Sequence, residues 1–133
     1  MNRRLDWPEK LAEYIESRRA EPFVWGTGGH DCVQFAAGAI EVMCFDNPAS
    51  PWVYSTEGEA QALIVAAGSL ENLVTQALGP AVHPSRAGRG DVVLATLELG
   101  DTLGVCLGND CAFATDPGVT FRPRTVATVT WKV

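Results

Sequence analysis

The residues best suited to chemistry stand between Trp25 and Phe35, where a glycine-rich turn leads into the predicted start of a helix. Asp31 is the expected N-cap residue, and Gln34, three positions later, completes the Asp-x-x-Gln pattern of a capping box. Cys32 then becomes the first residue of the helix. Unpaired N–H groups and the positive end of the helix dipole favour the thiolate of a cysteine at that position. The stretch therefore predicts the nucleophile half of a thiol-hydrolase site.

A thiol hydrolase also needs a base within hydrogen-bond reach of the sulfur, and the chain has only two histidines. We expect His30 to bond to the backbone of its turn, because a residue so close to Cys32 in sequence rarely lines up for proton transfer. His83 lies in a loop that could swing toward Cys32, although an exposed histidine in a loop usually has no role beyond the solvated surface. Both residues stay open as the base. A metal site built from His30, Cys32 and loop carboxylates is a weaker alternative.

Capping patterns predict four helices that would position this turn, near residues 6–20, 31–44, 56–67 and 69–78. Asp6 with Glu9 and Thr56 with Glu59 form further capping boxes, and Ser69 begins the last helix. In the second helix, apolar residues follow Cys32 at helical spacing, so its side chain should face the sheet. The residues expected to be buried beside it are Phe35, Ala36, Ala39 and Ile40.

The pattern changes after residue 90, where short β-like runs alternate with turns rich in glycine, aspartate and asparagine. Such runs predict an antiparallel sheet from about Asp91 to Val133. Helices first and strands afterwards indicate an α+β fold, with N-terminal helices packed on a small C-terminal sheet. We expect a single domain over residues 1–133, with a helical part at 1–80 and a sheet part at 90–133.

Composition excludes several classes of partner. The net charge is −6, and the few Lys and Arg residues are scattered, which argues against a nucleic-acid partner. The sequence has no apolar run of membrane-spanning length and no signal-peptide pattern, so we expect no membrane span and first folding in a cytoplasm. No cofactor is expected.

The four cysteines, at positions 32, 44, 106 and 111, contain no Cys-x-x-Cys pair, which argues against a zinc or iron–sulfur site. We expect reduced thiols and no native disulfide. Cys106 and Cys111 fall on neighbouring predicted strands, but side chains alternate between the faces of a sheet, so a bridge is unfavourable unless the register aligns them.

Several motifs together resemble a known group of proteins. Phe23-Val24-Trp25-Gly26, His30-Asp31-Cys32, Gly90 to Leu94 and Trp131 occur in this order in short phage and prophage tail-assembly proteins. Those proteins are similar to the NlpC-type papain-like cell-wall peptidases. The resemblance covers nearly the whole chain after the first helix. It implies a helical part that carries the cysteine, packed on a small curved antiparallel sheet.

The resemblance also implies a site, with Cys32 as the nucleophile. The family's general-base histidine begins a strand that corresponds to residues 102–108, where this chain has Thr102. The third, orienting residue would lie near 111–115, where no His, Asn or Gln occurs. We therefore expect a degenerate thiol site on a tail-tip or tail-assembly structural protein.

The expected partners are other phage tail proteins of the hub or tip, which could dock on the loops at 46–51 and 80–88. Peptidoglycan is a further candidate ligand, and the expected location is the host cytoplasm during assembly and then the virion tail. The alternative is a cysteine peptidase or amidase that cleaves peptidoglycan cross-bridges during infection, with Cys32 as nucleophile and His30 or His83 as base.

Overall fold

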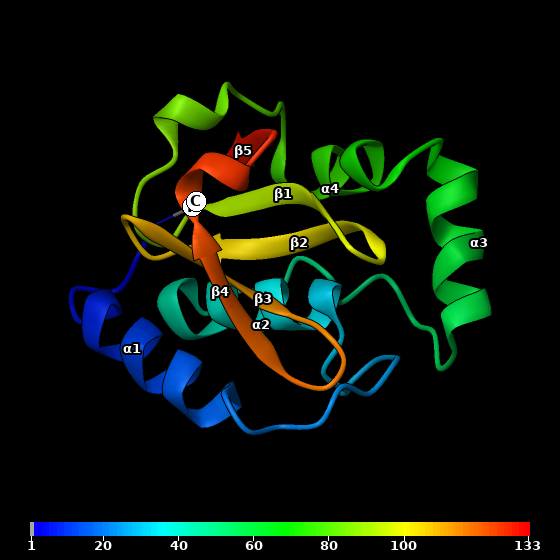
Figure 1. Cartoon of the computed structure of the whole chain (residues 1–133), viewed down its shortest axis with the longest axis horizontal. Helices are drawn as coiled ribbons and strands as arrows, with labels where there is room; N and C mark the ends of the chain where they lie inside the picture. Colours follow the sequence, from blue (N-terminus) through cyan, green and yellow to red (C-terminus); the bar gives the residue numbers. More distant parts are fainter. Residues whose placement is uncertain (1) are drawn as a thin grey trace.

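The computed structural model describes residues 2–133, and in this range four helices precede a five-stranded antiparallel sheet (Figure 1). This arrangement confirms the α+β fold with N-terminal helices. The helices are α1 (Trp7–Arg18), α2 (Cys32–Cys44), α3 (Glu57–Ala67) and α4 (Leu70–Leu78). The strands are β1 (Val92–Leu97), β2 (Gly100–Cys106), β3 (Asp110–Ala114), β4 (Val119–Pro123) and β5 (Val129–Trp131), and two short 3-10 turns are η1 (Pro84–Arg86) and η2 (Arg124–Val126).

Three of the four expected N-caps are present. The side chains of Asp31, Thr56 and Ser69 each accept a hydrogen bond from the backbone N–H three residues on. Asp6 does not cap α1, so the expected capping box there is wrong. Its backbone has φ −97° and ψ 22°, outside the extended region that a capping residue needs, and its carboxylate bonds to Arg4 instead, at 2.9 Å.

The strand order across the sheet is β4-β3-β2-β1-β5, with every neighbouring pair antiparallel. The first four strands follow one another as hairpins, and β5 returns to the other side of β1. Val92 of β1 therefore lies between Val105 of β2 and Trp131 of β5. The last strand, β5, spans only three residues and follows the 3-10 turn η2.

Both faces of the sheet are covered by other parts of the chain. Helix α2 lies along one face, and α1 packs beside α2, as Figure 1 shows. The opposite face is covered by irregular chain around Ala87, Val126 and Ala127. The buried residues on the α2 side include Val92, Leu94, Leu103, Val105, Ala112 and Trp131, and those on the opposite side are Val93, Ala95, Cys106, Cys111 and Phe113.

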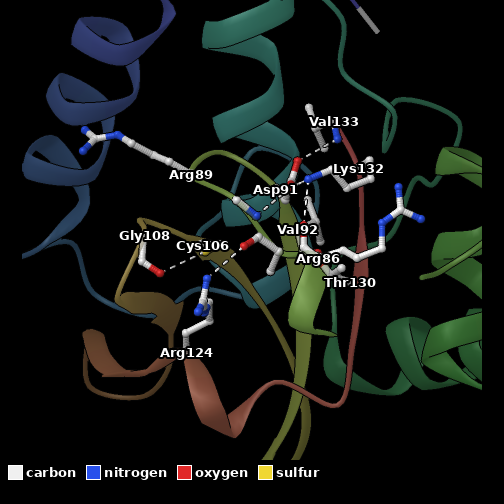
Figure 2. A network of polar contacts seen from close by, with 12 residues as sticks. Arg86, Arg89, Asp91, Val92, Cys106, Gly108, Arg124, Thr130, Lys132 and Val133 are labelled. Atoms are coloured by element: carbon white, nitrogen blue, oxygen red, sulfur yellow. Dashed lines mark hydrogen bonds and ion pairs between the residues drawn. The ribbon is translucent and has the colours of Figure 1, made fainter. Parts of the chain in front are cut away.

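A fully buried carboxylate, Asp91, joins both chain ends to the sheet at the start of β1 (Figure 2). It accepts from the guanidinium of Arg3 at 3.1 Å and from the ammonium of Lys132. It also accepts from the backbone N–H groups of Val133, at 2.9 Å, and Gly88, at 2.8 Å. One side chain thus connects the N-terminal segment, the loop before β1 and the C-terminal residues.

Replacing Asp91 by alanine removes all four of these interactions. We expect Asp91→Ala to lower the free energy of unfolding by about 3 kcal/mol, because two cations and two half-buried backbone amides lose their acceptor. Urea denaturation followed by circular dichroism measures this difference. Asp110→Ala, at an exposed position in the same sheet, is the matched control and should change stability by less than about 0.5 kcal/mol. Equal effects of the two substitutions would contradict this role for Asp91.

Candidate functional site

The turn before α2 is organised around the fully buried carboxylate of Asp31. One oxygen caps the helix by accepting from the N–H of Gln34 at 2.8 Å. The other accepts from the N–H of Gly26, at 3.1 Å, and from the hydroxyl of Tyr54, at 2.7 Å. The Gln34 side chain does not reach back to Asp31, as a full capping box requires, but donates to the Tyr54 hydroxyl at 3.3 Å. These contacts fix Cys32 as the first residue of α2.

Two glycines let the turn fold this tightly. Gly26 has φ +109°, and a Cβ placed there would lie 2.8 Å from the carbonyl oxygen of Tyr54. A Cβ on Gly29 would lie 2.5 Å from the carbonyl oxygen of Val24. The Trp-Gly and Gly-Gly pattern therefore serves the packing of the turn against neighbouring backbone.

Cys32 lies where two hollows in the surface meet. The first, the apolar pocket, is lined mainly by residues of α3, α4 and the preceding loop: Trp25, Val33, Trp52, Tyr54, Ala60, Gln61, Leu63, Ile64, Leu70, Leu73 and Asp101. The second, the acidic groove, is lined by Phe23, Trp25, Glu57, Gln61, Leu99, Asp101, Thr102, Ala114, Thr115 and Asp116. Cys32 lines both, and no Lys or Arg belongs to either lining, so the only charges around the thiol are carboxylates.

The thiol of Cys32 faces β2, as expected, but it is not activated. Burial raises its pKa to about 11. Hydrogen bonds from the backbone of Leu103, Cys32 and Val33 oppose this rise, and the negative charge of Asp31 adds to it. The helix N-terminus does favour the thiolate, as the sequence suggested, but desolvation is the larger effect. The expectation of a thiolate at Cys32 is therefore wrong.

Among the residues of β2, Asp101 is the best placed to act together with Cys32. Leu103 lies on the α2 face, so alternation along the strand puts Asp101 on that face and Thr102 on the other. Asp101 lines both hollows, whereas Thr102 lines only the acidic groove. The Asp101 carboxylate accepts from the hydroxyl of Thr96 at 2.9 Å, and the Thr102 hydroxyl donates to the carbonyl of Gly100.

His30 is buried on the other side of its turn from the hollows, with 3% of its surface exposed. Its ring meets the ring of Phe35 edge-on, with centroids 5.7 Å apart. Burial lowers its pKa, and the nearby cation Arg18 lowers it further. Its backbone pairs with Val24 in both directions, as expected for a turn residue, while its Nε2 has no hydrogen-bond partner. His30 is not among the groups that shift the pKa of Cys32.

His83 is an exposed residue near β5, the strand at one edge of the sheet. The Nδ1 of His83 accepts from the N–H of Ser85 at 3.1 Å. His83 thereby caps the start of the turn η1, which contacts β5. The structure therefore brings neither histidine to Cys32. Across residues 2–133, no three His, Cys, Asp or Glu side chains gather in an arrangement that could hold a metal ion.

The arrangement at Cys32 thus offers a protonated thiol, an exposed carboxylate and an apolar pocket. A carboxylate and a thiol on facing elements can bind polar groups of a ligand, and the pocket can take an apolar one. The imidazole that would transfer protons in a cysteine hydrolase is missing from these linings. The structure thus shows two adjoining hollows with a sulfur where they meet.

The chain belongs to the family described as "Domain of unknown function (DUF6950)", whose model matches residues 2–133. A comparison with curated proteins found no match. None of the helices in residues 2–133 has the length and apolar character needed to cross a membrane.

The hydrogen bond from Tyr54 to Asp31 should matter more than an ordinary buried one. We expect Tyr54→Phe to lower the free energy of unfolding by about 2 kcal/mol, because the donor is lost from a buried charged group. Tyr14→Phe is the control, since its hydroxyl donates to the neutral carbonyl of Phe35 at 2.8 Å; we expect about 1 kcal/mol there. A Tyr54→Phe protein as stable as the wild type in urea denaturation would contradict this ranking.

The raised pKa of Cys32 makes it a slow thiol near neutral pH. Because the pKa is about 11, against an ordinary value of 9.0, alkylation by iodoacetamide at pH 7.5 should be about 100-fold slower than for a free cysteine. The rate should keep rising as the pH increases toward 11, within the range where the protein stays folded. Peptide mapping by mass spectrometry gives the rate at Cys32 itself. Fast alkylation that levels off below pH 8 would show an activated thiolate instead.

Proposed function

We propose that this protein is a structural or assembly component of a phage tail tip, and that its thiol site binds without hydrolysing. The observation that carries the second part is the surroundings of Cys32, where burial raises the pKa and neither His30 nor His83 is in reach. The first part rests on the resemblance of the Trp25–Cys32 and Gly90–Leu94 motifs to tail-assembly proteins. On this proposal the chain is made in the host cytoplasm and then carried in the virion tail.

A cysteine hydrolase must move protons at three steps of each turnover. A base has to remove the thiol proton, the same group has to protonate the leaving amine, and water must then be activated on the acyl-enzyme. Thr102, at the position of the family's histidine, is held by a bond to the Gly100 carbonyl. Asp101 hydrogen-bonds to Thr96 on the neighbouring strand. The hydroxyl of Thr102 does not titrate near neutral pH, so it cannot replace the histidine as the base.

A binding role needs only a stable fold with surfaces that suit a partner. The apolar pocket and the acidic groove adjoin at Cys32, and exposed apolar side chains stand nearby on Val53 and Leu99. We propose that other tail proteins of the hub or tip dock on this side of the molecule.

A peptidoglycan digestion assay on the purified protein and on tail complexes tests the proposal. We expect no release of cross-bridge fragments by either sample. We also expect tails to assemble normally with Cys32→Ser, and equally with Cys44→Ser, which replaces a thiol remote from the hollows. Fragment release that is lost with Cys32→Ser but kept with Cys44→Ser would establish the competing function, a cysteine peptidase or amidase. Failure of the protein to associate with any tail complex would refute the structural role.

A further inference from the structure

A second pair of sulfurs lies on the face of the sheet that α2 does not cover. Cys106 of β2 and Cys111 of β3 are directly opposite each other in the register of the two strands. The sequence left this pairing to the strand register, and the register aligns the two cysteines, although all four thiols are free in the structure. The two-residue turn Gly108–Asn109 places them one step from the hairpin end, so their side chains leave the sheet on the same side.

The backbone bonding identifies the kind of pair. Leu107 donates to the carbonyl of Asp110, which makes those two residues the hydrogen-bonded pair next to the turn. Both backbone groups of Cys106 bond away from β3, its N–H to Asp91 and its carbonyl to the N–H of Gly90. Cys106 and Cys111 therefore form a non-hydrogen-bonded pair. In such pairs the Cα atoms are typically about 4.5 Å apart, which falls within the range that a disulfide spans.

The two thiols already interact. The interaction between the two thiols lowers the pKa of Cys106 and raises that of Cys111. Cys106 Sγ also donates to the carbonyl oxygen of Gly108, at 3.6 Å. Burial and the charge of Asp91 act to raise the pKa of Cys106, whereas the backbone of Gly108 and the guanidinium of Arg124, in η2 just outside the pair, act to lower it. Figure 2 shows Arg124 beside Cys106. A nucleophilic sulfur thus stands next to a second thiol that can attack it in turn.

We propose that Cys106 and Cys111 are a redox-active dithiol that closes to a cross-strand disulfide on exchange with a low-molecular-weight disulfide. The Cys106 thiolate attacks one sulfur of that disulfide, forms a mixed disulfide and releases one small thiol. Cys111 then loses its proton, attacks the Cys106 sulfur and releases the second small thiol. Two protein thiols are oxidised and one small disulfide is reduced to two thiols. This proposal does not depend on the function proposed for the Cys32 site.

The cover over the pair controls its access to solvent. Cys106 and Cys111 are fully buried beneath the irregular segment that contains Arg124. That segment is held by the Arg124 N–H, which donates to Asn109 at 2.9 Å, and by its guanidinium, which donates to Ala87 at 3.2 Å. Local opening of this short segment exposes the pair without unfolding the α2 side of the core. The protein should therefore be reduced in a cytoplasm and oxidise gradually outside it.

The test uses a Cys32→Ser, Cys44→Ser double variant, so that only the proposed pair can react. This protein is incubated with oxidised glutathione, quenched in acid and examined by intact mass and peptide mapping. We expect loss of two hydrogen atoms and a single Cys106–Cys111 link, reversed by excess reduced glutathione. A lasting glutathione adduct without ring closure, or two free thiols after prolonged exposure both in buffer and in urea below the unfolding midpoint, would overturn the proposal.

Arg124 provides an independent readout that a passive pair of buried thiols would not show. With Arg124→Gln, the pH at which the rate of mixed-disulfide formation is half-maximal should shift upward, because the Cys106 thiolate loses a neighbouring cation. Arg124→Lys keeps the charge and should retain the wild-type profile. An unchanged profile in both variants would refute the assignment of Cys106 as the attacking sulfur.

Discussion

The interaction on which the functional side of this molecule depends is the buried carboxylate of Asp31 with its three donors. Taking a carboxylate out of water is costly unless hydrogen bonds replace the water. Here the donors come from three separate segments: the Gly26 turn, the first turn of α2 and the loop that carries Tyr54. Meeting the needs of one charge therefore fixes the relative position of all three. Cys32, the next residue, has its place at the junction of the two hollows because of that constraint.

Asp91 repeats the same device at the start of the sheet. It too is fully buried immediately before a regular element and takes donors from distant parts of the chain. Its own backbone carbonyl accepts from the N–H of Cys106, so the network of Figure 2 continues into the paired thiols. The two carboxylates thus hold the irregular segments to opposite sides of one core. The helices and strands between them pack around the apolar core.

The sequence predicted the elements well because their signals are local. Caps, helical spacing and short turns each act within a few residues, and three of the four caps and the antiparallel sheet are as expected. The features that the sequence could not predict depend on the register of strand pairing or on the packing of an aromatic ring against distant residues. The role of Asp101 follows from the register of β2, and the burial of His30 depends on Phe35 and Arg18. The facing of Cys106 and Cys111 had a readable signal, because a Gly-Asn turn between two β-like runs fixes the hairpin register.

The two sulfur sites show that position at a helix start does not by itself decide reactivity. Cys32 has the helix N-terminus in its favour, yet it is desolvated and its nearest charge is the carboxylate of Asp31. Cys106 is also buried, but a thiol donor and the Arg124 cation stabilise its charged form. In each case the pKa of the thiol depends on the balance between desolvation and the charge or hydrogen bonding of the neighbouring groups. By that balance the more acidic sulfur lies in the sheet, on the face away from α2, and the cysteine at the head of the helix remains a thiol.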